Sequence, residues 1–237
     1  MAKKPIKRAE RLEIVYEERS WQLLNQLRSK AVDIMETLDN HHLRSIVHGS
    51  IARGDVSETS DIDVFLPDPP SSFILETYLE QSGFRNYSRI IVQATPIYAL
   101  KGHIELDQQT SLSFPLVKLR PVEKDFYRFG GEASLSILKE EKRVSGVDKR
   151  LMLIEPTTDG HVESAVVGQE EEVANLLGVS LNTVLDRVRA LIRRDEIGRT
   201  GVFIEKKIAP DETFEQALKY LADQNPAVRR RTKFYKK

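Results

Sequence analysis

Two aspartates separated by one residue, Asp61 and Asp63, stand at the start of an apolar run that has the composition of a β-strand. Alternate residues of a strand point to the same face, about 6.5 Å apart along the chain, so both carboxylates project together while Ile62 and Val64 face the core. Their charges repel unless a cation lies between them. Carboxylate oxygens are ligands that Mg²⁺ prefers, and two ions about 4 Å apart activate an attacking hydroxyl and neutralise a leaving phosphate. The pair therefore predicts a magnesium site, with two ions expected.

A Gly-Ser pair precedes the two aspartates in the chain. Gly49 ends a short apolar stretch, where the backbone can approach a ligand closely, and Ser50 begins a short helical turn. Free N–H groups and a hydroxyl at such a turn form a seat for phosphate. Arg53 adds positive charge, and Gly54 permits the turn that follows. This stretch predicts a binding site for the triphosphate of a nucleotide.

The composition describes an ordinary soluble protein with room for two compact units. The chain has 237 residues, of which 40% are hydrophobic and 30% charged, and its 36 basic side chains balance 36 acidic ones. There is no cysteine, which excludes disulfides, thiolate nucleophiles and Cys-built zinc sites and favours a reducing cytoplasm. No stretch approaches the roughly 20 apolar residues of a membrane span, so we expect a cytoplasmic protein without a membrane partner.

Mixed α and β elements position these residues. Apolar residues at helical spacing predict one or two helices over residues 10–39, and a helix after Ser71 or Ser72 ends at Gly83. The Pro-Thr-Thr-Asp-Gly stretch at 156–160 is the best candidate for a linker. Short strands are expected at 43–48, 62–66, 89–94, 103–107 and 112–118, with a hairpin turn at 108–109 between the last two.

The string G-S-x-A-R-G at 49–54, followed by S-D-I-D at 60–63 and a hydrophobic run, resembles the nucleotidyltransferase superfamily of DNA polymerase beta, in particular its small prokaryotic members. The resemblance covers about residues 43–118. It implies an α+β fold in which a mixed β-sheet is flanked by helices. An exposed acidic turn after an ordinary strand is the alternative interpretation of the aspartates. The resemblance makes Asp61 and Asp63 metal ligands and places Gly49, Ser50, Arg53 and Ser60 at the nucleotide.

The resemblance also implies a third carboxylate on a neighbouring strand, acting as general base on the acceptor hydroxyl or as a further metal ligand. Two residues of the HIELD segment, Glu105 and Asp107, share a face opposite Ile104 and Leu106. Glu105 lies mid-strand, whereas Asp107 is also suited to start the hairpin turn. Both stay candidates for the catalytic role.

The second half of the chain contains a helix pair over residues 169–193, with a tight turn at Gly178 and a cap at Ser180. The following GRTGVFIEKKI has the pattern of a β-ribbon wing, so residues 161–208 are similar to winged helix-turn-helix domains. The alternative is that the helix pair serves packing or dimerisation. In the winged interpretation, the residues at a nucleic-acid groove or its phosphates are Asn182, Thr183, Arg187, Arg189, Arg199 and Lys206.

These observations predict a magnesium-dependent nucleotidyltransferase that moves a nucleotide from an NTP to a hydroxyl of an acceptor. The sequence does not identify the acceptor, and a nucleic acid, DNA or RNA, is the favoured candidate. The alternative is a DNA-binding regulator whose nucleotidyltransferase-like domain senses a nucleotide or is inactive. A third option is modification of a protein or small molecule, with the winged domain used for dimerisation. The expected domains are a helical segment (1–42), the nucleotidyltransferase domain (43–156), the winged helix-turn-helix (157–210) and a helix with a basic tail (211–237).

Overall fold

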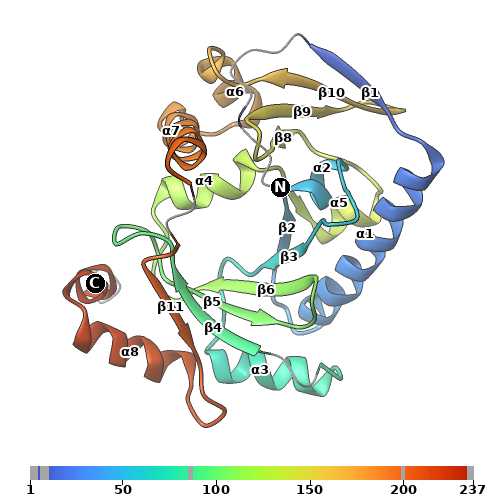
Figure 1. The fold of residues 1–237 in the computed structure, drawn as a ribbon. Coiled ribbons are helices and arrows are strands. Elements are labelled where there is room, and N and C mark those ends of the chain that lie inside the picture. The colour runs from blue at the N-terminus through green and yellow to red at the C-terminus, as the bar shows by residue number, and fades with distance from the viewer. Residues whose placement is uncertain (1–4, 6–10, 85–87, 199–200, 234–237) are drawn as a thin grey trace. The chain divides into compact units, whose positions relative to one another are not determined.

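The computed structural model describes residues 5, 11–84, 88–198 and 201–233 (Figure 1). Two compact units divide the chain, and each is assembled from three separate segments. The first unit comprises Met1–Val32, Val47–Ser60 and Lys124–Thr200. The second unit comprises Asp33–Ile46, Asp61–Glu123 and Gly201–Lys237. The boundary between Ser60 and Asp61 therefore separates the Gly-Ser turn from the acidic pair.

The first unit contains an antiparallel four-stranded sheet in the order β1-β10-β9-β8 (Figure 1). Its strands are β1 (Leu12–Val15), β10 (Gly160–Ala165), β9 (Met152–Pro156) and β8 (Gly146–Val147). β1 lies at the edge and pairs with β10 from Leu12↔Glu163 to Val15↔Gly160. The N-terminal segment is thus a strand followed by α1 (Glu18–Asp39), and the expectation of helix from residue 10 is wrong there.

The segment expected to be a linker, 156–160, is instead the turn of the β9–β10 hairpin. Thr157 N donates to Gly160 O at 2.9 Å, and His161 pairs with Pro156. A linker was predicted because Pro and Gly mark both linkers and tight turns, and only the pairing of the flanking strands distinguishes them. The boundary expected between residues 156 and 157 therefore falls inside this hairpin.

Helices pack beside this sheet and build the core of the first unit. They include α4 (Pro121–Phe129), α6 (Glu170–Leu177) and α7 (Leu181–Ile197), with the short α2 (Ser50–Arg53) and α5 (Leu135–Lys139). β2 (Ile46–His48) lies beside β7 (Glu132–Ser134). The core joins the helix pair α6–α7 to the rest of the unit through Phe129, Val147, Leu151, Leu153, Val166, Val173, Ala174, Val184, Val188 and Leu191.

The second unit is built on a mixed sheet in which strands follow the order β11-β4-β5-β6-β3 (Figure 1). β3 is parallel to β6, and the other pairs are antiparallel. The strands expected at 62–66, 89–94, 103–107 and 112–118 are present here, with ends shifted by up to three residues: β3 (Ile62–Phe65), β4 (Ser88–Gln93), β5 (Lys101–Glu105) and β6 (Thr110–Pro115). The strand expected at 43–48 is β2, and β11 (Ile204–Lys207) lies at the edge of the sheet.

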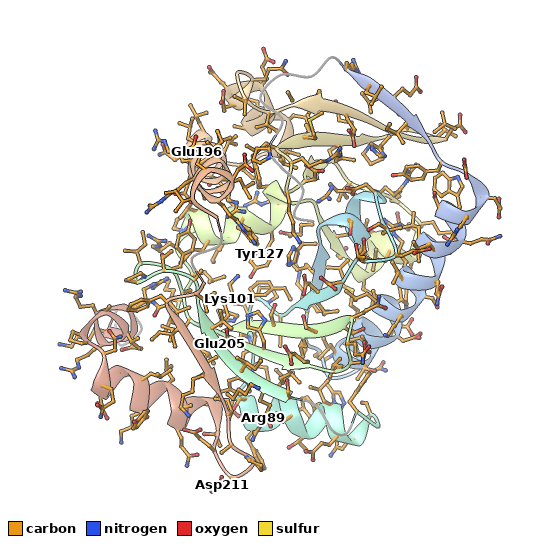
Figure 2. All side chains as sticks on the ribbon, in the orientation of Figure 1. Arg89, Lys101, Tyr127, Glu196, Glu205 and Asp211 are labelled. Atoms are coloured by element: carbon orange, nitrogen blue, oxygen red, sulfur yellow. The ribbon has the colours of Figure 1, made fainter. Side chains whose placement is uncertain are left out.

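Three helices, α3 (Ser72–Gln81), α8 (Phe214–Gln224) and α9 (Pro226–Lys233), complete the second unit. The rings of Phe114 in β6 and Phe214 in α8 meet edge to face with centroids 5.1 Å apart. Arg89 in β4 forms an ion pair of 2.7 Å with Glu76 in α3. Arg89 and Lys101, both labelled in Figure 2, come from adjacent strands and occupy opposite faces of the sheet. The helices α3 and α8 thus cover one face of the sheet, and Lys101 and Asp63 lie on the other face.

The segment predicted to be a wing belongs to this second sheet. β11 pairs with β4 from Ile204↔Gln93 to Lys207↔Ile90. The apolar and β-branched residues expected to form a ribbon beside the helix pair complete the edge of a different sheet, so the wing prediction is wrong in the part of the segment that the structure describes. Within the described residues, no helix combines the length and the apolar composition needed to cross a membrane.

Candidate active site

The Gly-Ser turn in the first unit is fixed by backbone hydrogen bonds. Gly49 has φ of +80°, a conformation that glycine adopts without strain, and its N–H donates to Gly131 O at 3.0 Å. Ala52 N and Arg53 N both donate to Gly49 O, which starts the short α2 at Ser50. The sequence predicted this turn correctly because Gly-Ser before a short helical segment is a strong local signal.

Two of the residues assigned to the nucleotide lie together. The Ser50 and Ser60 hydroxyl oxygens are 3.2 Å apart, and Ser60 Oγ also accepts a hydrogen bond from Ser57 N at 2.9 Å. The loop between them therefore returns to the turn where it began. Asp61 follows Ser60 directly in the chain. Ser50 and Ser60 thus form one polar group within the segment Val47–Ser60 of the first unit.

Arg53, which was predicted to contact a phosphate, has its observed contacts inside the first unit. Its side chain is buried, with 5% of the residue exposed. The guanidinium donates to Gly130 O at 2.5 Å and to the Asp55 carboxylate at 2.9 Å. The sequence showed a cation near the turn but not the buried carbonyl that attracts it. Arg53 therefore stabilises the loop, and its contact with a nucleotide stays a prediction.

Arg28 of α1 binds the backbone of the Gly-Ser turn, a contact that the sequence analysis missed. Its guanidinium donates to Ile51 O at 3.0 Å, to Ala52 O at 2.9 Å and to Lys142 O at 2.9 Å. Burial lowers the pKa of Arg28 to about 10, so the group is still a cation at neutral pH. Two of these bonds reach carbonyls of α2, a helix of four residues that is too short to supply donors to them, and the third joins α1 to the Lys142 backbone. An arginine within the apolar face of α1 was the only local signal.

The acidic pair in the second unit shows the predicted alternation. Asp61 is exposed, Ile62 is fully buried and Asp63 is half-buried. Ile62 N donates to Gln109 O at 2.7 Å, which anchors the beginning of β3. Asp63 lies directly opposite Ser111 of β6, and Ser111 Oγ donates to Asp63 Oδ1 at 2.8 Å. Both carboxylates therefore project from the side of the sheet that α3 and α8 do not cover.

The two candidates for the third carboxylate differ in position. Glu105 of β5 is opposite Ser111 of β6, and Ser111 is in turn opposite Asp63 of β3. The three residues therefore form one row across three strands. The Glu105 carboxylate accepts a hydrogen bond from the Ser88 hydroxyl. Asp107 lies in the hairpin turn, where its Oδ1 accepts from Gln109 N at 2.9 Å. β6, the strand directly beside β3, thus carries Ser111 in this row, and the carboxylate of Glu105 lies on β5, one strand further away.

Two basic groups share this polar face. His103 and Lys101 precede Glu105 at alternate positions of β5. Burial lowers the pKa of His103, and the Lys101 ammonium lowers it further, while the carboxylates of Asp63 and Glu105 oppose the shift. Lys101 Nζ lies 5.6 Å from the centre of the Phe65 ring, as expected for side chains on one face. His103 is therefore held as the neutral imidazole at neutral pH.

The donor set around Asp63 fits a hard divalent cation. Asp61 and Asp63 offer carboxylate oxygens at a surface that water can reach, and Mg²⁺ is usually held by one or two carboxylates together with water and substrate phosphates. No cluster of three or more His, Cys, Asp or Glu side chains suited to a metal occurs in the parts of the chain that the structure describes. A metal here would thus take its remaining ligands from phosphate oxygens and water.

The helix pair is formed as predicted, but its second helix begins against α4. Gly178 is left-handed with φ of +63°, and Ser180 caps α7 by accepting from Thr183 N at 3.1 Å. The Asp125 carboxylate of α4 accepts from Ser180 N at 3.2 Å and from Thr183 Oγ1 at 3.1 Å. Thr183 is fully buried. The prediction that Thr183 faces a nucleic-acid groove is therefore wrong, because its hydroxyl serves this contact inside the unit.

The other residues assigned to nucleic acid are divided between the two units. Arg187 is half-buried, and its guanidinium lies 4.8 Å from the centre of the Phe126 ring. Asn182 and Arg189 are exposed on α7. Lys206 belongs to β11 in the second unit, where its Nζ pairs with Glu212 at 2.6 Å. Arg199 lies outside the described residues.

The comparisons with known proteins point to one family. A family model described as a nucleotidyltransferase domain matches residues 28–167, which is more than half of the chain. No curated protein and no solved structure matches the chain significantly. The matched range contains the Gly-Ser turn, the acidic pair and both candidate third carboxylates, and it ends before α6.

Proposed function

Because the chain belongs to the nucleotidyltransferase domain family, we propose that it transfers a nucleoside monophosphate from an NTP to a hydroxyl of an acceptor and releases pyrophosphate. The observation that carries this proposal is the acidic pair, in which a fully buried Ile62 separates two accessible carboxylates and the Ser111 hydroxyl donates to one of them. An ordinary exposed acidic turn would not need a neighbouring strand to hold its carboxylate. Asp61 and Asp63 are our proposed ligands for Mg²⁺, with two ions expected.

The reaction needs a phosphate seat, a base and charge neutralisation. The acceptor oxygen forms a bond to the α-phosphorus while the bond from that phosphorus to the pyrophosphate oxygen breaks, and the acceptor proton passes to a base. The divalent ions supply neutralisation of the charge that develops on the phosphates. We assign the phosphate seat to the hydroxyls of Ser50 and Ser60, while Gly49, whose N–H already donates to Gly131 O, shapes the turn that presents them. These residues hold and orient the triphosphate for in-line displacement.

We assign the base to Glu105 in preference to Asp107. Glu105 stands in the row of Asp63, with only Ser111 between them, whereas the Asp107 carboxylate binds the backbone of its own turn. An exposed carboxylate near a bound hydroxyl can accept a proton, and such transfer contributes about 10²- to 10⁴-fold to a rate.

Two features of the helix pair α6–α7 argue against a nucleic-acid acceptor. In the first turn of α7, Thr183 is buried and bonded to Asp125 of α4, and the first turn of α6 carries Glu170, Glu171 and Glu172, which would repel phosphates. The alternative proposal, a DNA-binding regulator with a nucleotide-sensing domain, meets the same obstacle. A protein or small-molecule acceptor is compatible with a helix pair that serves packing.

Transfer of label from NTPs tests the proposal. The full chain is incubated with each α-labelled NTP and Mg²⁺, and separately with RNA, duplex DNA or a cell lysate. Asp63→Asn is the test variant, and Asp68→Asn, an exposed carboxylate five residues later, is the matched control. We expect label on one acceptor class with wild type and Asp68→Asn and none with Asp63→Asn. Absence of transfer, combined with salt-sensitive duplex binding that Asp63→Asn retains, would support the regulator instead.

A further inference from the structure

The Ser111 hydroxyl is in direct contact with the acidic pair. It lies on β6 between the strands of Asp63 and Glu105 and is directly opposite both. Its Oγ donates to Asp63 Oδ1 at 2.8 Å, a bond between part-buried groups. Strand pairing fixes the two backbones, so the hydroxyl meets the carboxylate without reorganisation of the chain.

We propose that Ser111 is a positioning residue that orients the Asp63 carboxylate for a divalent cation. This inference rests on the proposed function. A carboxylate that accepts a hydrogen bond through one oxygen is held in one rotamer, with its other oxygen directed elsewhere. Hydrogen-bonding partners of metal ligands act in this way in many sites, and their removal commonly weakens metal binding about 10- to 100-fold.

The competing account is that Ser111 only satisfies its own hydroxyl within the sheet. Ser113 provides a matched comparison because it lies two residues later on the same strand and the same face. Ser113 is opposite Phe65 and His103, so it has no carboxylate as its direct neighbour across either strand. Removing either hydroxyl deletes one oxygen from β6, but only Ser111→Ala removes a donor to Asp63.

Binding of Mn²⁺ to the full-length protein tests the inference without an acceptor. Free Mn²⁺ is followed by electron paramagnetic resonance as protein is titrated, for wild type and for Ser111→Ala, Ser111→Thr, Ser113→Ala and Asp63→Asn. We expect Ser111→Ala to weaken binding about 10-fold. Ser111→Thr keeps the hydroxyl and should bind as wild type does, and so should Ser113→Ala. Thermal unfolding in EDTA checks that all the variants are folded.

The outcomes separate this inference from the proposed function. If Asp63→Asn binds weakly while Ser111→Ala binds like wild type, Asp63 is a ligand and the role of Ser111 is refuted. If Ser111→Thr binds as weakly as Ser111→Ala, the hydroxyl is not the cause and the role is again refuted. If wild type takes up no Mn²⁺, or Asp63→Asn binds it equally well, the proposed metal centre fails and this inference fails with it.

Discussion

Replacement of Arg28 by methionine should loosen the Gly-Ser turn and lower the stability of the first unit. Arg28 makes three hydrogen bonds to backbone carbonyls, two of them on α2. Bonds from a charged donor contribute about 1.5 to 3 kcal/mol each, and the cost of burying the guanidinium offsets part of the sum. Ala52 O keeps its second donor, Val144 N. We therefore expect Arg28→Met to cost about 3 to 5 kcal/mol, because Ile51 O and Lys142 O lose a donor.

Arg19 offers the matched control on the same helix. Its side chain is 82% exposed and pairs with Glu58 at the surface, where such pairs contribute about 0 to 1 kcal/mol. Thermal unfolding should show a fall of roughly 10 °C for Arg28→Met and little change for Arg19→Met. Titration with ATP below the unfolding range should show weaker binding by Arg28→Met alone. Equal unfolding temperatures for the two variants would refute the reasoning about the buried guanidinium.

Three further predictions concern the polar face of the second unit. Ser111→Asp places a second carboxylate directly opposite Asp63, so in EDTA its free energy of unfolding should be lower than that of wild type by about 1 kcal/mol. Mn²⁺ should reverse this loss by binding between the carboxylates, and a variant that Mn²⁺ does not stabilise would contradict the metal site. Glu105→Gln should slow label transfer about 100-fold, while Asp107→Asn should change it less than threefold, and the reverse order would reassign the base. Folding lowers the pKa of His103, so the unfolded state binds a proton at a higher pH than the folded state does, and the free energy of unfolding should fall as pH drops below 6.5. Urea titrations at successive pH values should show a weaker pH dependence for His103→Gln than for wild type. An unchanged pH dependence would exclude His103 as its source.

Local patterns were sufficient to predict the backbone conformation and the alternation of burial around the candidate residues. The alternation around Ile62 predicted which side chains share a face, and the structure confirms that Ile62 is buried while Asp61 is exposed. The turn at Gly49 was predictable for the same reason, since a glycine before a short helical segment is read from adjacent residues. Both signals depend on backbone periodicity within a few positions.

Contacts between distant segments were not predictable in this way. Arg28 and Arg53 both donate to carbonyls about 80 to 115 residues away, at Lys142 and Gly130 respectively, and any residue type supplies a carbonyl. β11 carried a correct strand signal but the wrong partner, because the sequence does not state which sheet edge a strand will join. Glu105 and Asp107 could be separated only when the register of β5 and β6 was known.

The interleaving of the two units has a consequence for how the protein is made and dissected. The chain passes between them five times, so no single cut yields both units intact. During synthesis, β4 must wait for β11 to emerge more than a hundred residues later before its edge is covered. Truncation after residue 167, where the family match ends, would strip that edge and remove α6 and α7 from the other core. Expression trials should therefore retain the entire polypeptide, and limited proteolysis should release no stable half.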